Sequence, residues 1–185
     1  FYGKQPQKVK IYLHGSFGTV YKGQATDRAI IAGLLGMNTN DENVKNAFRV
    51  AEEKNMAYEF IPGNLGMGHH PNTAKIEIQD ENETFTVTGA SIGGGTIKIT
   101  NINGFNVDIK ESMDDTYTII VMHKDTRGVI KTISSALTTE NNNIASMHCV
   151  RLAKEGDAMT IIETDEKIGE VTLNKIKMDH PFIYS

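Results

Sequence analysis

Residues 89–99 read Gly-Ala-Ser-Ile-Gly-Gly-Gly-Thr-Ile-Lys-Ile, and strand-like runs at 84–88 and 96–100 flank the serine and the three glycines. Glycine loses more backbone entropy on folding than any other residue, so an ordinary turn rarely needs three in a row. Consecutive glycines are useful where the backbone takes a positive φ or where another group approaches it closely. Their N–H groups can also form a nest for a carboxylate or phosphate. The stretch predicts a hairpin, with an anion-binding loop as the alternative.

The residues around this stretch predict a mixed α/β arrangement. Alternating apolar residues indicate a half-buried strand at 7–13. A loop is expected at 14–22, a helix at 26–36 with Thr26 as its cap, and a second helix at 41–54. Further strands are predicted at 57–61, 73–78, 85–90, 96–102 and 105–109, with Asn103-Gly104 as a hairpin turn and a glycine-rich loop at 62–71.

A second pattern begins after the polar segment 111–115, which we interpret as a linker. It predicts a strand at 116–122, a helix at 128–137, strands at 144–152 and 158–163, a helix at 168–176 and a short strand at 182–184. The order β-α-β-β-α-β is that of the ferredoxin-like, or split-βαβ, fold. The predicted fold class is therefore α+β, with one domain at 1–110 and another at 115–185.

The composition limits the class of protein. The chain has 185 residues, of which 39% are hydrophobic and 23% charged, as in a soluble globular protein. Nineteen basic residues against 23 acidic ones give a net charge of −4 without a basic stripe, which disfavours a nucleic-acid partner. No apolar run approaches the roughly 20 residues that span a bilayer, and no signal peptide is recognisable, so no membrane association is expected.

The sequence contains one cysteine, Cys149. It cannot form an intrachain disulfide, which fits a reducing cytoplasm. One thiol also cannot hold an iron–sulfur cluster, because such clusters normally take three or four. We expect Cys149 to be a small buried residue in mid-strand, and His123 and His148, also in predicted strands, to be structural.

The loop at 124–130 joins the first strand and helix of the second pattern. Amides at a helix N-terminus can receive a carboxylate, Gly128 allows close backbone approach, and Asp125 could meet an ammonium group. The alternative is a helix cap with a tight turn. The motif Asp-x-x-Gly-Val-Ile in this loop and Asn-Asn-Ile at the next strand resemble an ACT domain, although the family commonly has proline where Arg127 stands.

The ACT resemblance implies that a small amino acid binds at this loop, between paired copies of the domain, and regulates an attached enzyme. Self-association is therefore expected. The implied ligand-binding residues are Asp125, Thr126, Arg127, Gly128, Val129, Ile130, Asn142, Asn143 and Ile144.

Four motifs mark the first half: Leu-His-Gly-Ser-Phe at 13–17, Gly-Gln-Ala-Thr-Asp-Arg-Ala at 23–29, His-Pro-Asn-Thr at 70–73 and Ser-Ile-Gly-Gly-Gly at 91–95. In this order, and followed by an ACT-like pattern, they resemble the beta subunits of iron–sulfur-dependent L-serine dehydratases. The resemblance implies deamination of L-serine to pyruvate and ammonia in the cytoplasm. It also implies a 4Fe-4S cluster, held by a cysteine-bearing alpha subunit, that acts as a Lewis acid on the serine hydroxyl. This chain would then be inactive alone and hold no metal.

Residue roles within these motifs are hypotheses. His70 could act in acid–base chemistry, because an unperturbed imidazole titrates at about pH 6.5. Alternatively, it could cap a turn. Adjacent side chains seldom converge on one ion, so His69-His70 is not expected to be a metal pair. The predicted catalytic residues, at the interface with the alpha subunit, are His70, Asn72 and Ser91; the predicted substrate-binding residues are Thr73, Gly93, Gly94 and Gly95.

Two other functions remain open at this point. Some 3-phosphoglycerate dehydrogenases carry a similar domain before an ACT domain, but no Gly-x-Gly-x-x-Gly turn for a nucleotide is present here. A free-standing amino-acid sensor is the other alternative. The dehydratase beta subunits also begin with a Ser-Ser-Ser-His-Thr segment that this sequence does not contain, so we expect the first domain to lack its N-terminal segment.

Overall fold

The computed structural model describes residues 4–23, 25–81, 83–110, 116–178 and 183–184. The chain divides into two compact units, Phe1–Glu111 and Ser112–Ser185. The predicted linker at 111–115 lies outside the described residues. Within the described ranges, no helix is long and apolar enough to cross a membrane.

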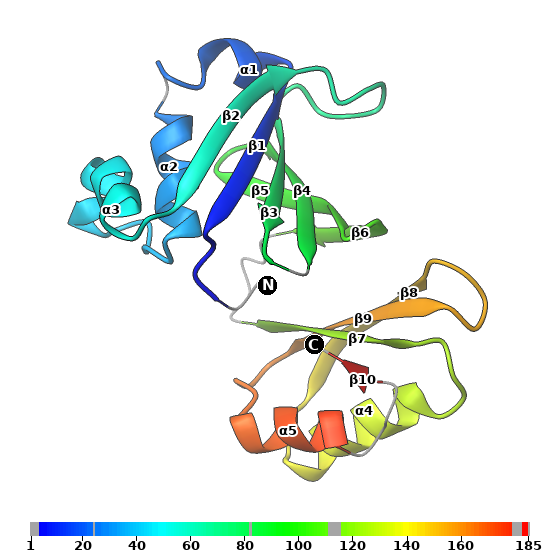
Figure 1. Ribbon diagram of the computed structural model, residues 1–185. Helices are drawn as coiled ribbons and strands as arrows, with labels where there is room; N and C mark the ends of the chain where they lie inside the picture. Colours follow the sequence, from blue (N-terminus) through cyan, green and yellow to red (C-terminus); the bar gives the residue numbers. More distant parts are fainter. Residues whose placement is uncertain (1–3, 24, 82, 111–115, 179–182, 185) are drawn as a thin grey trace. The chain divides into compact units, whose positions relative to one another are not determined.

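The first unit contains a six-stranded sheet in the order β2-β1-β3-β4-β5-β6 (Figure 1). Its strands are β1 (Lys8–His14), β2 (Ala57–Gly63), β3 (Thr73–Gln79), β4 (Thr84–Gly93), β5 (Thr96–Ile102) and β6 (Phe105–Lys110). β1 and β2 are parallel and the other neighbours antiparallel. Each strand predicted in this half is present, and Asn103-Gly104 forms the expected turn with positive φ at both residues.

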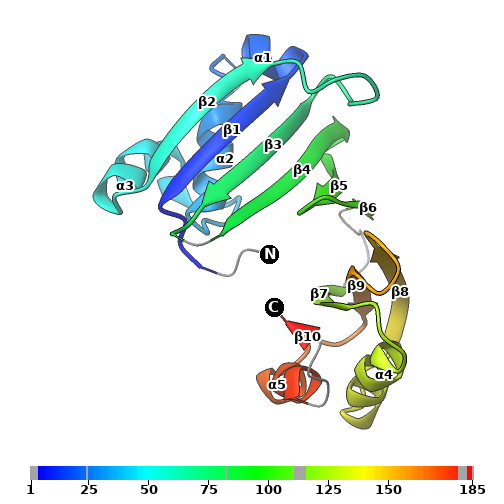
Figure 2. The ribbon, with the colours of Figure 1, turned by 45° about the vertical axis from the view of Figure 1, so that its right-hand side comes forward.

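Helices cover one face of this sheet (Figure 2). They are α1 (Ser16–Val20), α2 (Thr26–Leu34), the 3-10 helix η1 (Glu42–Asn46) and α3 (Ala47–Glu53). The predicted helix at 41–54 is thus two segments, and the carboxylate of Asp41 caps the first by accepting the Asn43 N–H at 2.8 Å.

Two predictions at the start of this unit were wrong. The expected loop at 14–22 contains α1, because Phe17 and Tyr21 pack against the core and fold the segment into one helical turn. Thr26 does not cap α2: Ala25 occupies the N-cap in the left-handed conformation, with no side-chain cap bond. Short helices set by tertiary packing leave little periodic signal.

The alternation in β1 separates the two faces of the sheet. Val9, Ile11 and Leu13 are at most 1% exposed. They pack with the helices through a core that also includes Ile31, Ala32, Ala47, Ala51, Met56 and Ile78. Because side chains alternate along a strand, the neighbouring positions point to the other face, away from the helices. That second face carries the site described below.

The second unit contains β7 (Tyr117–Lys124), α4 (Val129–Thr139), β8 (Ile144–Arg151), β9 (Asp157–Thr164), α5 (Glu170–Met178) and β10 (Ile183–Tyr184). The strand order is β10-β7-β9-β8, and all neighbours are antiparallel. This is the split-βαβ topology, and the α+β fold class is confirmed. Both helices pack on the sheet through a core that includes Val121, Val129, Ile133, Ala136, Leu137, Ile162 and Ile176.

Cys149, His148 and His123 all lie in strands, as predicted, but they differ in burial. β8 is an edge strand, so Cys149 and His148 are exposed, and the buried position predicted for Cys149 was wrong. His123 is 2% exposed; its Nε2 lies 2.8 Å from Thr160 Oγ1 and its Nδ1 lies 2.8 Å from the Lys124 carbonyl oxygen. His123 is therefore a hydrogen-bonded core residue, as expected.

The core of the second unit makes a stability prediction. Ile133 on α4 is 0% exposed, whereas Ile130 on the same helix is 39% exposed. Truncation of a buried isoleucine removes apolar contacts and leaves a cavity. We expect Ile133→Ala to lower the free energy of unfolding of this unit by about 2–5 kcal/mol, and Ile130→Ala by about 0.5 kcal/mol. Urea denaturation monitored by amide exchange measures the free energy of unfolding of each variant. Equal losses in the two variants would contradict the assigned core.

Candidate functional site

Three of the four motifs meet at one edge of the six-stranded sheet. β1 and β2 are parallel and end there, β3 begins there, and β4 ends there. The register pairs Leu13 with Ala74 and Thr73 with Ala90, which brings segments 14–17, 62–73 and 91–95 together. We call these three segments the motif edge. The fourth motif starts α2, and its Gln24 lies outside the described residues.

Gly15 is held against Pro71 at this edge. Its φ is +56°, and a Cβ on it would lie 2.7 Å from the Pro71 carbonyl oxygen and 2.9 Å from the Pro71 Cα. The Phe17 N–H donates to the same oxygen at 3.5 Å. A side chain at position 15 would therefore force two backbone segments apart, so this motif needs glycine for both its conformation and its close approach.

Hydrogen bonds of the backbone connect Ser91 on β4 to His70 within the motif edge. The Ser91 N–H donates to the Asn72 carbonyl at 3.0 Å, and the Asn72 N–H donates to His70 Nδ1 at 3.1 Å. The buried Thr73 hydroxyl donates to the His70 carbonyl at 2.7 Å. Because Nδ1 accepts a hydrogen bond, the proton of the neutral imidazole lies on Nε2. The exposed His70 ring thus offers Nε2 to solvent or to a ligand.

His14 fixes the loop between β2 and β3. Its Nδ1 accepts the Leu65 N–H at 3.0 Å, and its ring meets the His69 ring edge-on with 5.9 Å between centroids. The Asn64 Oδ1 accepts the Gly66 N–H at 2.8 Å. The role of His14, which lies in the first motif, could not be predicted from the sequence because its contacts lie about fifty positions further along the chain.

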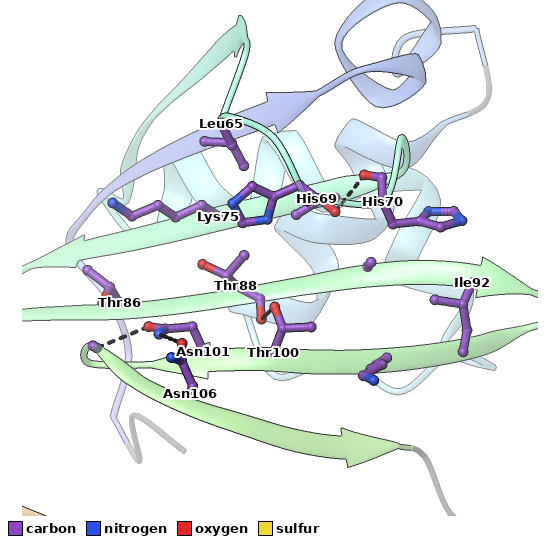
Figure 3. Close-up of a pocket in the computed structure, with 15 residues that line it drawn as sticks. Leu65, His69, His70, Lys75, Thr86, Thr88, Ile92, Thr100, Asn101 and Asn106 are labelled. Atoms are coloured by element: carbon purple, nitrogen blue, oxygen red, sulfur yellow. Dashed lines mark hydrogen bonds between the residues drawn. The ribbon is translucent and has the colours of Figure 1, made fainter. Parts of the chain in front are cut away.

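A groove lies on the sheet face that points away from the helices (Figure 3). Its volume is about 710 Å³. Its walls are the loop after β2 and the outward positions of β3, β4, β5 and β6. We call it the sheet groove; its lining residues are Leu65, Gly68, His69, His70, Thr73, Lys75, Thr86, Thr88, Ala90, Ile92, Lys98, Thr100, Asn101, Gly104 and Asn106.

The sheet groove has a positive lining. None of the described residues that line it is acidic, while Lys75 and Lys98 contribute ammonium groups. Lys75 Nζ lies 5.6 Å from the centre of the Tyr12 ring. Lys98 Nζ donates to Asp108 Oδ2 at 2.8 Å, and this bond lowers the pKa of the Asp108 carboxyl. Because Lys98 is already paired with Asp108, Lys75 and the hydroxyls of Thr86 and Thr88 are the groups that suit a small anion such as a carboxylate.

Only part of the predicted site lines this groove. Of the predicted residues, His70 and Thr73 do so, whereas Asn72 and Ser91 contribute backbone bonds at its end. Ser91 lies between Ala90 and Ile92, which both line the groove, and alternate side chains of a strand point to opposite faces. The two lysines of the lining and its other threonines, Thr86, Thr88 and Thr100, were not predicted, although the alternating threonines at 84–88 indicated one polar face.

Of the three glycines at 93–95, Gly93 ends β4 and Gly94 and Gly95 form the β4–β5 hairpin turn. Their φ values are +99°, +62° and +82°, and a Cβ on any of them would meet no described atom within 4 Å. Their requirement is therefore conformational, because the space around them is open. The close approach considered from the sequence occurs at Gly89 instead, where a Cβ would lie 2.8 Å from Ile99 Cδ1.

The groove offers no metal site of its own among the residues that the structure describes. No group of three or more His, Cys, Asp or Glu side chains in this part of the chain could hold an ion. Figure 3 shows the rings of His69 and His70 turned in opposite directions.

The predicted ligand loop of the second unit joins β7 and α4. Asp125 Oδ2 accepts hydrogen bonds from Arg151 Nη1 at 2.8 Å and from the Glu155 N–H at 3.1 Å, and these lower the pKa of the Asp125 carboxyl. Thr126 Oγ1 is buried and has no hydrogen-bond partner among the described residues. Gly128 is the N-cap of α4 with a φ of +92°. The loop thus combines an ionised carboxylate, a hydroxyl without a described partner and the N-terminus of α4.

The other predicted ligand residues lie at the opposite end of α4. The Asn142 amide donates to the Leu137 and Glu140 carbonyls at 3.3 Å, while the Asn143 N–H donates to Glu166 Oε2 at 2.7 Å. An 11-residue helix is roughly 16 Å long. One copy of the unit therefore does not bring Asn142 and Asn143 to the loop at 125–130.

Comparison with known proteins gives two informative sets of relatives. The chain is 37% identical to a probable L-serine dehydratase beta chain of Bacillus subtilis over 175 residues, covering 95% of this chain and 78% of the relative. It is 37% identical to an L-serine dehydratase beta chain of Peptoniphilus asaccharolyticus over 164 residues, covering 88% and 72%. A D-3-phosphoglycerate dehydrogenase of B. subtilis is 27% identical over 175 residues, covering 94% of this chain but 32% of the dehydrogenase. No protein-family model matches the chain.

Gly15 makes a prediction for the motif edge. Gly15→Ala places a methyl group against Pro71, so we expect an unfolding cost of about 1–2 kcal/mol for the positive φ and about 1–3 kcal/mol more for the overlap. Gly36→Ala is the matched control, because Gly36 also has a positive φ but no described atom lies near its Cβ position. Amide exchange at Leu65 and Ser91 should accelerate only in Gly15→Ala. Equal behaviour of the two variants would contradict the close approach.

Proposed function

The chain belongs to the L-serine dehydratase beta-chain family, and from this we propose that it is the beta subunit of a cytoplasmic enzyme that deaminates L-serine to pyruvate and ammonia. The observation that carries the proposal is the motif edge. Segments far apart in the sequence are joined there by backbone contacts and border a positively lined groove. A small amino acid with a carboxylate matches the charge of that groove.

The resemblance implies a 4Fe-4S cluster, which the described residues of this chain do not fit as ligands. Cys149 is the only cysteine in the sequence, and it lies on β8 of the second unit rather than at the groove. We therefore assign the cluster to the cysteines of a separate alpha subunit, where it would supply a Lewis acid for the serine hydroxyl. This chain is then inactive by itself.

This chain's residues would bind the substrate and handle a proton. Lys75 would attract the serine carboxylate, and the hydroxyls of Thr86 and Thr88 would donate hydrogen bonds to it. His70 would act as the acid–base group through Nε2, because Nδ1 is held by the Asn72 N–H. Thr73 and Asn72 would set the orientation of His70, as positioning residues.

Reconstitution of the wild-type chain with its alpha subunit, under anaerobic conditions, tests the proposed reaction. We expect serine-dependent pyruvate from the mixture and none from this chain alone. Pyruvate from this chain alone, or an inactive mixture with a fully loaded cluster, would contradict the proposal.

The same assay tests His70. We expect His70→Ala to lower kcat by about 10²–10⁴-fold, the range for loss of a general acid–base group. His148→Ala is the control, because His148 is an exposed histidine on β8. Turnover by His70→Ala that matches His148→Ala would remove His70 from the mechanism while leaving the subunit assignment intact.

We further propose that the second unit binds a small amino acid, L-serine being the first candidate, between two paired copies. The loop at 125–130 supplies one set of contacts, and Asn142, Asn143 and Ile144 at the far end of α4 supply another. A ligand that contacts both sets requires a second copy. The dehydrogenase relatives match nearly the whole chain over only about a third of their own length, so related units occur there as one part of a longer protein.

Thr126 tests this regulatory site. Thr126→Val keeps the shape of the side chain but removes the hydroxyl that has no partner in the described structure. One lost hydrogen bond is worth about 1–1.5 kcal/mol, so we expect roughly tenfold weaker L-serine binding by calorimetry. Thr118→Val, at an exposed position on β7, should not change the affinity. Wild-type chain that binds no serine would refute the site, and equal affinities would refute the role of Thr126.

A further inference from the structure

Met67 stands at the tip of the loop after β2, and its side chain is 102% exposed. We propose that Met67 is an anchor that inserts into an apolar pocket of the alpha chain; this inference rests on the proposed function. A single exposed apolar side chain is ordinary and needs no partner. The loop that carries Met67, however, is shaped by two glycines and tied to the sheet beside the groove.

The backbone on both sides of Met67 is set by glycine. Gly66 has a φ of +102° and Gly68 a φ of +91°, values that side-chain-bearing residues rarely adopt. No described atom lies within 4 Å of a Cβ built on either, so neither glycine is required by packing. Both glycines therefore serve only the backbone conformation of the loop tip, and each has an entropic cost to folding. The result is a methionine lifted clear of the remainder of the unit.

The base of the same loop is tied to the sheet. The Leu65 N–H donates to His14 Nδ1, and the His69 ring lies against the His14 ring. Pro71 is held beside Gly15 by the close backbone approach described above. An anchored loop loses less conformational freedom on binding than a loose one, so this construction presents Met67 in advance of binding.

Met67 lies next to the sheet groove but does not line it. Leu65, Gly68, His69 and His70 all line the groove, whereas Met67 does not. Its side chain therefore stands outside the rim that its neighbours form. A protein that closes over the groove, as a subunit completing the active site would, meets Met67 at that rim. Ile92, 40% exposed on β4, offers a second apolar contact in the groove itself.

The chemistry of the loop favours a protein pocket. Residues 64–71 contain no Asp, Glu, Lys or Arg, so the contact is apolar and should depend little on salt. Methionine is flexible and polarizable, which suits irregular protein surfaces, and it is enriched at interfaces. The alpha chain is the occupant to which we commit, because the family is named for one chain of an assembly.

The test compares two exposed methionines. Met67→Ala should weaken binding of the cluster-loaded alpha chain by about 30-fold in Kd, the effect of an interface hot spot. Met178→Ala is the control, because Met178 is 83% exposed on α5 of the other unit, and its Kd should equal that of wild type. At saturating alpha chain the kcat of Met67→Ala should match that of wild type, and the slope of Kd against salt should not change.

Several results would overturn the inference. A Kd of Met67→Ala equal to that of Met178→Ala would refute the anchor while the active wild-type complex upheld the proposed function. A fall in kcat at saturating alpha chain with an unchanged Kd would place Met67 in the chemistry instead. Weaker self-association with unchanged alpha-chain binding, measured by sedimentation, would make a second copy the occupant. A wild-type chain that forms no complex and no pyruvate would refute both proposals.

Discussion

The close approach of Gly15 to Pro71 is the constraint on which the motif edge depends. A Cβ atom at position 15 would lie only 2.7 Å from the Pro71 carbonyl oxygen, so no residue other than glycine fits there without displacing the backbone. This contact joins the end of β1 to the start of β3, and from there the chain of hydrogen bonds runs through Asn72 to Ser91 on β4. The loop that carries His69 and His70 is fixed by the same contact. The motifs are therefore parts of one backbone arrangement rather than separate sites.

Much of the fold could be predicted because its elements have strong local signals. The alternating run of β1, the Asn103-Gly104 turn and the βαββαβ order all depend on residues close together in the sequence. Elements that depend on distant contacts could not be predicted. α1 forms because Phe17 and Tyr21 reach the core, and the edge position of β8, which exposes Cys149, follows from strand order alone.

The candidate site follows the same division. His70 and Thr73 were found from a motif, and both line the groove. The charge of the groove was not found, because Lys75 and Lys98 lie on different strands and become neighbours of one cavity only through pairing with β4. Ser91 was included for its type and place in a motif, but strand alternation turns its side chain away from the groove. Short motifs therefore located the edge, and sheet register decided which side chains share it.

We propose that the motif edge is the surface at which this chain completes an enzyme. The most direct test is hydrogen–deuterium exchange of the chain with and without its alpha subunit, under anaerobic conditions. We expect new protection in segments 14–17, 62–73 and 91–95, with little change at the opposite ends of the strands, at Gln79 and Asp80 and at 103–104. Protection confined to those opposite ends, or none at the motif edge in an active complex, would contradict this proposal.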